Sequence, residues 1–308
     1  MATPGDNTVS ERLPREIENA LVDFGAQMLS ESKHLSRSIS KMINELPSVF
    51  PRLDLIDQKP AKSEKSALSE SHKVLYGNHE NPLDAVKPDA CTQPVGIGNC
   101  YFVAAMASLS KSNPQAIVDM IKSNKDGTYT VKFPGASESY TVEKPTKEEL
   151  EQVGGSSSYG DWPVVMMKAF GKHCGGGKGG IEKTDGGSLF SRGVRMLTDK
   201  GVANNGVGYI VPLLNWKDLD SELNGAMNSK DALPVTASTR YSFSNEKTTK
   251  AGFRSEHVYS VLSYKPDPKN LKEGKVLVRN PWGGPDATTE ITLQQFSDNF
   301  FQLSIPKR

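Results

Sequence analysis

Three residues that can do chemistry together stand at separate places in this 308-residue sequence. Cys100 follows two glycines and an asparagine in VGIGNCYFVAAMASL, where a small, apolar, helix-like run begins. His257 opens the alternating stretch HVYSVLSYK, and Asn280 ends the stretch KVLVRN. A thiolate forms more easily at a helix N-terminus and beside an imidazole. The three residues therefore indicate nucleophilic catalysis by a cysteine.

Each of these signals is weak when it is taken alone. A lone cysteine such as Cys100 is more often a buried structural residue. A histidine that acts as a base needs an acceptor on its other ring nitrogen. Asn280 supplies this acceptor for His257 if the two strands pair as a hairpin, because the ends of the strands then meet. The combination favours a catalytic site.

The surrounding segments predict an α+β fold, with a helical half that carries Cys100 and a β half that carries His257. DWPVVMMKAFGKH has a proline just inside the start of a predicted helix over 161–173. DGTYTVKFPG alternates apolar and polar residues after an Asp-Gly turn and predicts a strand. Further strands are predicted in ALPVTAST, HVYSVLSYK, GKVLVRN and TEITLQQF.

The same segments resemble a known family. GNCYFVAAMASL, EHVYSVLSY and VLVRNPWG are similar to the three signature blocks of the calpain family of papain-like cysteine proteases. DWPVVMMKAF resembles the family's tryptophan-bearing helix, and LTDKGV resembles a glycine segment beside its substrate cleft. The resemblance covers about residues 90–305, in order, and is closer to short bacterial members than to animal ones. It implies a papain-like, two-lobed catalytic domain.

The resemblance also implies roles for single residues. Cys100 would be the nucleophile, His257 the general base and then acid, and Asn280 the residue that orients the imidazole. Trp282 would shield the Asn–His hydrogen bond from water, which strengthens such a bond. The oxyanion would be held by the backbone N–H of Cys100 and by Gln93.

Two positions near the site depart from the family pattern. Gln93 lies seven residues before Cys100, whereas the family's oxyanion glutamine lies six before its cysteine. Either the glycine-containing loop before Cys100 accommodates the extra residue, or the extra residue displaces the Gln93 side chain. Glu256 stands where the family usually has glycine; its carboxylate either raises the pKa of His257, or favours basic substrates, or is a solvated charge. With Gly98 and Gly201, it is expected to border the substrate cleft.

The implied function is limited proteolysis by a cysteine endopeptidase, a thiol hydrolase that works through an acyl-enzyme. Two alternatives remain at this level. The same triad also serves acyltransferases, and a catalytically silent papain-like module would use the fold for binding. The displaced Gln93 favours the silent module, whereas the intact Cys100, His257 and Asn280 argue against it.

No cofactor is expected to be required. Animal calpains carry a calcium-binding insertion after the family tryptophan, but here the corresponding loop offers only Asp286 and Glu290. Calcium prefers ~6–8 oxygen ligands, so that site is expected to be absent. The sequence leaves a calcium site in the first half open. The adjacent His173 and Cys174 suit no common zinc-ligand spacing, so no metal ligands are predicted.

The chain divides into three predicted regions: a helical arm over residues 1–51, a linker over 52–75 and the catalytic domain over 76–308. Apolar residues recur at helical spacing within 10–46, and a Pro-, Lys- and Ser-rich stretch follows. The arm is expected to contact either its own catalytic domain or a partner, as an amphipathic appendage does.

Composition limits the partners and the cellular location. The formal net charge is +1, without the clustered positive excess that nucleic acid or an anionic membrane requires. No apolar run is long enough to span a membrane, and the N-terminus has no secretory signal pattern. The three cysteines do not indicate a disulfide framework. We expect protein or peptide substrates and a cytoplasmic location, with export by a non-classical route as the alternative.

Overall fold

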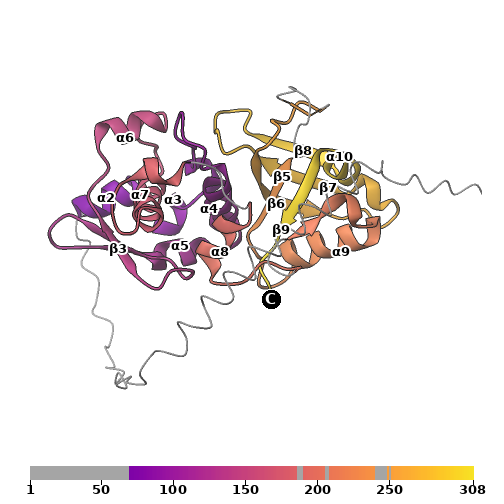
Figure 1. The fold of residues 1–308 in the computed structure, drawn as a ribbon, viewed down its shortest axis with the longest axis horizontal. Coiled ribbons are helices and arrows are strands. Elements are labelled where there is room, and N and C mark those ends of the chain that lie inside the picture. Colours follow the sequence, from indigo (N-terminus) through magenta and orange to yellow (C-terminus); the bar gives the residue numbers. More distant parts are fainter. Residues whose placement is uncertain (1–68, 186–189, 205–207, 240–247, 250) are drawn as a thin grey trace, which may run out of the picture. The chain divides into compact units, whose positions relative to one another are not determined.

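The fold is taken from a computed structural model, which describes residues 69–185, 190–204, 208–239, 248–249 and 251–308 (Figure 1). The predicted helical arm over 1–51 and most of the predicted linker over 52–75 lie outside these residues. The boundaries at 51 and 75 therefore stay predictions. The last residues of the predicted linker, from Glu70 on, form a helix whose residues Val74 and Leu75 are buried in the core.

The first part of the described chain, up to Val202, is mainly helical and is called here the helical part. Its helices are α2 (Glu70–Tyr76), α3 (Pro82–Ala85), α4 (Cys100–Ser112), α5 (Pro114–Met120), α6 (Lys147–Gln152), α7 (Trp162–Cys174) and α8 (Arg192–Thr198), with the 3-10 turns η1 (Pro88–Ala90) and η2 (Ile181–Thr184). A small antiparallel sheet contains β1 (Ile121–Ser123), β2 (Tyr129–Lys132) and β3 (Ser139–Val142).

The core of the helical part forms around α4 and α7, which are apolar on nearly every side. Ten of the residues of α4 are buried, as expected for a helix at the centre of a domain. The rings of Phe102 and Phe170 stack across the two helices with centroids 4.0 Å apart. Asn113 ends α4 and caps α5, whose first residue is Pro114. The helix that begins at Cys100 is therefore buried along most of its length.

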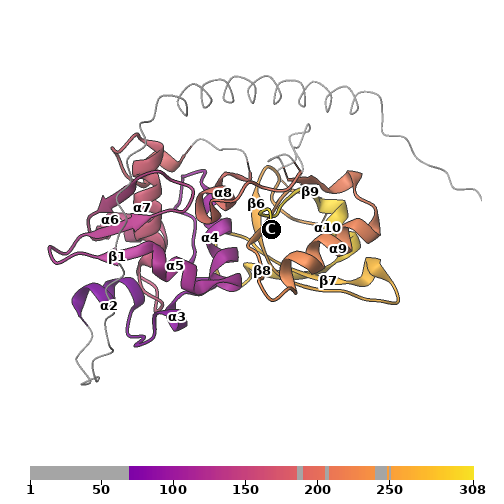
Figure 2. The same ribbon diagram turned by 90° about the horizontal axis from the view of Figure 1, so that it is seen from below.

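The second part, from Gly208 on, is called here the sheet part. It contains β4 (Tyr209–Ile210), η3 (Val211–Leu213), α9 (Trp216–Met227), β5 (Val235–Thr239), β6 (Val258–Lys265), η4 (Leu271–Glu273), β7 (Lys275–Arg279), β8 (Thr288–Thr292), α10 (Leu293–Asn299) and β9 (Phe300–Ser304). The six strands form one antiparallel sheet in the order β4-β9-β5-β6-β7-β8. Figures 1 and 2 both show α4 on one face of this sheet and α9 and α10 on the other.

The mixture of helices and sheets confirms the predicted α+β class. The helix predicted over 161–173 and the strands predicted around 129, 235, 258 and 275 are confirmed. TEITLQQF was predicted as one strand, but only its first residues belong to β8. Thr292 and Gln295 form a reciprocal capping box that ends β8 and starts α10, because each side chain bonds the other's backbone N–H.

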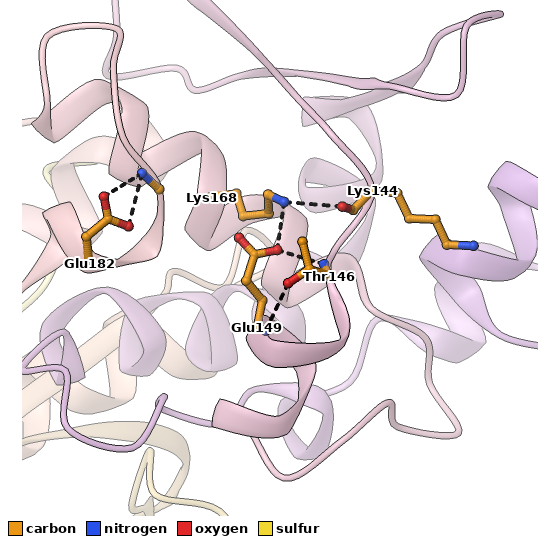
Figure 3. A network of polar contacts seen from close by, with 6 residues as sticks. Lys144, Thr146, Glu149, Lys168 and Glu182 are labelled. Atoms are coloured by element: carbon orange, nitrogen blue, oxygen red, sulfur yellow. Dashed lines mark hydrogen bonds and ion pairs between the residues drawn. The ribbon is translucent and has the colours of Figure 1, made fainter.

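A nearly buried ion pair ties α6 to α7 (Figure 3). Lys168 Nζ lies 2.7 Å from Glu149 Oε2 and donates to the carbonyl oxygen of Lys144 at 3.2 Å. Glu149 also accepts from the backbone N–H of Thr146, which caps α6. The Lys168 ammonium therefore has both a carboxylate and a carbonyl oxygen as partners, and a buried charge needs such partners.

No helix within the described ranges is both long enough and apolar enough to cross a membrane.

Serine hydroxyls join α4 to the sheet part. Ser108 Oγ donates to the carbonyl oxygen of Val261 at 3.2 Å and accepts from the backbone N–H of Val235 at 2.7 Å. Ser260 Oγ donates to the carbonyl oxygen of Ala104 at 2.9 Å. Ser108 and Ser260 are both fully buried. These bonds hold α4 against β5 and β6.

We predict that Ser108→Ala lowers the free energy of unfolding by about 1–3 kcal/mol, because it leaves the buried N–H of Val235 without a partner. Ser112→Ala is the matched control on the same helix, since the Ser112 hydroxyl has no hydrogen-bond partner. Urea denaturation of both variants measures the difference. Equal unfolding free energies for the two variants would contradict this account of the contact.

Candidate active site

Cys100 is the first residue of α4 and is partly buried. Burial raises the pKa of its thiol, whereas the backbone N–H groups of Val258, Tyr101 and Cys100 itself lower it in part. Two of these donors belong to the first turn of α4, where N–H groups have no partner within the helix. The third belongs to the residue after His257. The thiol therefore lies where α4 meets the start of β6.

His257 immediately precedes β6, and the residue is 5% exposed. Its ring Nε2 lies 3.0 Å from Asn280 Oδ1, at the end of β7. The antiparallel pairing of β6 with β7 brings these two strand ends together, as the hairpin prediction requires. Thr239 fixes the backbone of His257, because its Oγ1 accepts the His257 N–H at 3.1 Å and its N–H donates to the His257 carbonyl.

The environment of His257 favours the neutral ring. The pKa of His257 is lowered to about 4, mainly because burial disfavours the charged ring; the hydrogen bond with Asn280 raises the pKa in part, and the positive charge of Arg254 lowers it. Because Nε2 contacts an oxygen acceptor, it carries the ring proton in the neutral form. Nδ1 is then left with a lone pair that can accept a proton.

Trp282 lies beside the histidine and the asparagine. Its ring centroid is 5.0 Å from that of His257, and its backbone N–H donates to Asn280 Oδ1 at 3.0 Å. Asn280 Oδ1 therefore accepts from two donors, which fixes the orientation of its amide. Trp282 is 52% exposed, so one side of the ring faces solvent, and the Arg254 guanidinium lies 5.9 Å from its centroid.

Gln93 lies against the turn that follows Asn280. Its backbone N–H donates to the carbonyl oxygen of Pro281 at 2.7 Å. Its side-chain Nε2 donates to the carbonyl oxygen of Ile97 at 2.6 Å, within the loop that leads to Cys100. Gly96 in this loop has φ +78°, a conformation that favours glycine and lets the chain double back. One amide hydrogen of Gln93 holds the loop, and the second has no acceptor in the described residues.

Glu256, Gly98 and Gly201, which were expected to border a substrate cleft, lie in different local environments. Glu256 is exposed, and its backbone has φ +53°, in the left-handed region. This conformation costs energy for a residue other than glycine, which is a physical reason why glycine suits this position. Gly98 donates its N–H to Asp185 Oδ1 at 2.7 Å.

Gly201 lies at a different place, where it lines a cavity of about 360 Å³ with Arg192, Arg195 and Lys200. Neither Cys100 nor His257 lines this cavity. The cavity therefore does not join Gly201 to the thiol.

Within the described residues, no group of three or more His, Cys, Asp and Glu side chains is placed to hold a metal ion. Asp286 is exposed in the turn after β7, and Glu290 is exposed on β8. Calcium needs several converging oxygen ligands, which these two carboxylates do not supply.

Sequence patterns gave no sign of three residues that contact the site. Arg254 lies over Trp282, and Thr184 and Asp185 contact the residues around Cys100. In addition, Arg279, which is 2% exposed, lies 3.6 Å from Asp89 Oδ1 and links the residue before Asn280 to η1. Thr184 and Asp185 reach the site only through tertiary contacts, and no sequence pattern indicated the contacts of Arg254 and Arg279.

A family model described as calpain family cysteine protease matches residues 76–298. The match covers more than half of the chain, and this chain therefore belongs to the calpain family of cysteine proteases. A search of curated proteins gave no match to an individual sequence. The resemblance carried by the three sequence blocks is thus confirmed at the level of the family.

The lowered pKa of His257 predicts that the stability of the protein depends on pH. In a Cys100→Ser background, the hydroxyl does not ionise, and His257 titrates alone. The folded state keeps the ring neutral down to about pH 4, whereas the unfolded chain takes up the proton near pH ~6.5. The unfolded state thus binds more protons between these values, and stability falls as the pH falls.

Between pH 7 and 4.5 we expect Cys100→Ser to lose about 2 kcal/mol more unfolding free energy than Cys100→Ser/His257→Gln. Glutamine removes the titration and keeps an amide donor. Urea denaturation at both pH values measures the losses. Equal losses in the two proteins would show that burial does not depress this pKa.

Proposed function

We propose that the chain is a cysteine endopeptidase with a two-lobed, papain-like catalytic domain that cleaves protein or peptide substrates. The observation that carries this proposal is the His257 Nε2–Asn280 Oδ1 contact at 3.0 Å, next to the Val258 N–H that faces the Cys100 thiol. Membership of a cysteine protease family supports the reaction class.

In the proposed reaction, Cys100 Sγ attacks the carbonyl carbon of the scissile peptide bond. The thiol proton passes to His257 Nδ1, since Nε2 is engaged with Asn280. The carbonyl oxygen becomes an oxyanion, held by the backbone N–H of Cys100 and by the second amide hydrogen of Gln93. The intermediate collapses when His257 protonates the leaving amine, and this step leaves a thioester on Cys100.

The second half of the reaction releases the acyl group. His257 takes a proton from water, and the oxygen of that water attacks the thioester carbonyl. The tetrahedral intermediate then expels Cys100 Sγ, which recovers its proton from His257. The product is a carboxylic acid, and the enzyme returns to its starting state with all protons balanced.

Burial explains why cysteine and histidine must act as a pair. Each isolated charge is disfavoured, because burial raises the pKa of Cys100 and lowers that of His257. Proton transfer from thiol to imidazole creates two opposite charges side by side, which offsets part of this cost. Asn280 is neutral, so it orients the ring without adding a third charge to the site.

A catalytically silent binding module is the second candidate. The bond from Gln93 Nε2 to Ile97 favours it, because this bond occupies one of the two hydrogens that an oxyanion would use. Gln93 still has its second amide hydrogen, and the Cys100 N–H is independent of Gln93. The peptidase is therefore the better-supported function, and labelling of the thiol distinguishes the two.

We predict that a chloroacetamide- or vinyl-sulfone-based peptide probe labels the wild-type protein at neutral pH and does not label Cys100→Ala. Cys174→Ala is the matched control, because Cys174 is also a partly buried thiol, and its Sγ accepts from Arg192 Nη2 at 3.4 Å. It should label at the wild-type rate. Intact-mass spectrometry measures all three proteins. Equal labelling of wild type and Cys100→Ala, or none in either, would rule out the peptidase.

We also predict that peptidase activity is unchanged by EDTA and by added calcium. The reason is the small number of carboxylates after Trp282, where only Asp286 and Glu290 stand before residue 291. The measurement is the initial rate of peptide cleavage with chelator, with calcium and with neither. A loss of activity on chelation that calcium restores would contradict calcium independence.

A further inference from the structure

The side chain of Asn99 departs from the usual behaviour of an asparagine at a helix start. Asn99 is the N-cap residue of α4, and such residues normally accept a hydrogen bond from an N–H of the first turn. Here the side chain makes no capping bond. The N–H groups of Phe102 and Val103 donate to the backbone oxygen of Asn99 instead.

The Asn99 side chain points to η2. It is fully buried, and its Nδ2 donates to Thr184 Oγ1 at 3.0 Å, with Met167 Sδ at 3.7 Å. Thr184, which is 1% exposed, donates its hydroxyl proton to the carbonyl oxygen of Ile181 at 2.6 Å. Because a hydroxyl has one proton, Thr184 can only accept from Asn99. The direction of this buried relay is therefore fixed.

The same segment holds the residues on both sides of Cys100. Tyr101 Oη donates to the Thr184 carbonyl oxygen at 3.2 Å, and the Gly98 N–H donates to Asp185 Oδ1 at 2.7 Å. Gly98, Asn99 and Tyr101 are thus each bonded to Thr184 or Asp185. The thiol-bearing residue lies in the middle of this set of contacts.

The relay keeps the N-terminus of α4 open. Asn99 Oδ1 has no hydrogen-bond partner in the described residues, so it takes no N–H from the helix. The N–H groups of Cys100 and Tyr101 remain directed at the thiol, where they favour the thiolate. If the Asn99 side chain turned back to cap α4, its oxygen would compete for donors of this turn and bring a partial negative charge toward the thiolate.

We propose that Thr184 is a positioning residue that holds Asn99 away from the N-terminus of α4 and so keeps the donors of the first turn free for the Cys100 thiolate and the oxyanion. The proposal rests on the proposed function of Cys100 as the nucleophile. Asp185 supports the same arrangement by fixing the loop at Gly98.

The test is the rate at which iodoacetamide alkylates Cys100, followed by peptide mass mapping in a Cys174→Ala background. Thr184→Val keeps the shape of the side chain and removes the hydroxyl, whereas Thr184→Ser keeps the hydroxyl. We expect Thr184→Val to slow alkylation at pH 7 about tenfold, to shift its pH profile upward by about one unit and to lower kcat with little change in KM. Thr184→Ser should stay within about twofold of the parent.

Glu182→Gln is the control on the same turn, because Glu182 bonds the N–H of Gly180 and not the residues around Cys100 (Figure 3). It should leave alkylation unchanged. Asn99→Ser is the second variant in case Thr184→Val does not fold. Serine loses the bond to Thr184 but is a good helix cap, so the melting temperature should be kept while alkylation slows.

Equal alkylation rates in Thr184→Val and Thr184→Ser would overturn the proposal, as would an unchanged rate in Asn99→Ser. Slower alkylation in Thr184→Val and in Asn99→Ser, with Thr184→Ser close to the parent, would support it. If no protein cleaves peptides but the alkylation differences persist, the proposed peptidase function fails while the role of Thr184 stands. The two conclusions are therefore tested separately.

Discussion

The packing of α4 against β6 is the contact on which the whole site depends. Each element belongs to a different part of the fold, and buried hydroxyls of Ser108 and Ser260 bond backbone oxygens across the junction. Val258, at the start of β6, is buried in the core of the helical part. This shared packing sets the thiol of Cys100 against the start of β6, next to His257.

Hydrogen bonds within the protein engage most polar groups at this junction and leave a few atoms without a partner. Asn280 Oδ1 accepts from His257 and from the Trp282 backbone, which leaves His257 Nδ1 open. The Asn99 side chain bonds Thr184 rather than its own helix, and the N–H groups of Cys100 and Tyr101 face the thiol. Buried groups normally find partners, so atoms left free at one junction indicate where a substrate is expected to complete the set.

The sequence predicted those parts of the site that depend on helices, strands and hairpins close together in the chain. Helix, strand and hairpin periodicity predicted that His257 and Asn280 would meet, and their contact at 3.0 Å agrees with this. Capping at Thr292 was missed because threonine suits a strand as well as a helix N-cap, and Thr292 stands within a strand-like run. Thr184 was not predictable, since it lies 84 residues beyond Cys100 on a short turn that only the tertiary fold brings close.

The central claim is that Cys100, His257 and Asn280 act on a carbonyl at the N-terminus of α4. A crystal structure of the protein with a peptide aldehyde tests it most directly, because a thiol adds to an aldehyde as it would to a substrate carbonyl. We predict a covalent bond from Cys100 Sγ, with the new oxygen within hydrogen-bond distance of the Cys100 N–H and Gln93 Nε2 and the His257–Asn280 contact kept. Aldehyde bound elsewhere, or an adduct whose oxygen faces neither donor, would contradict the account.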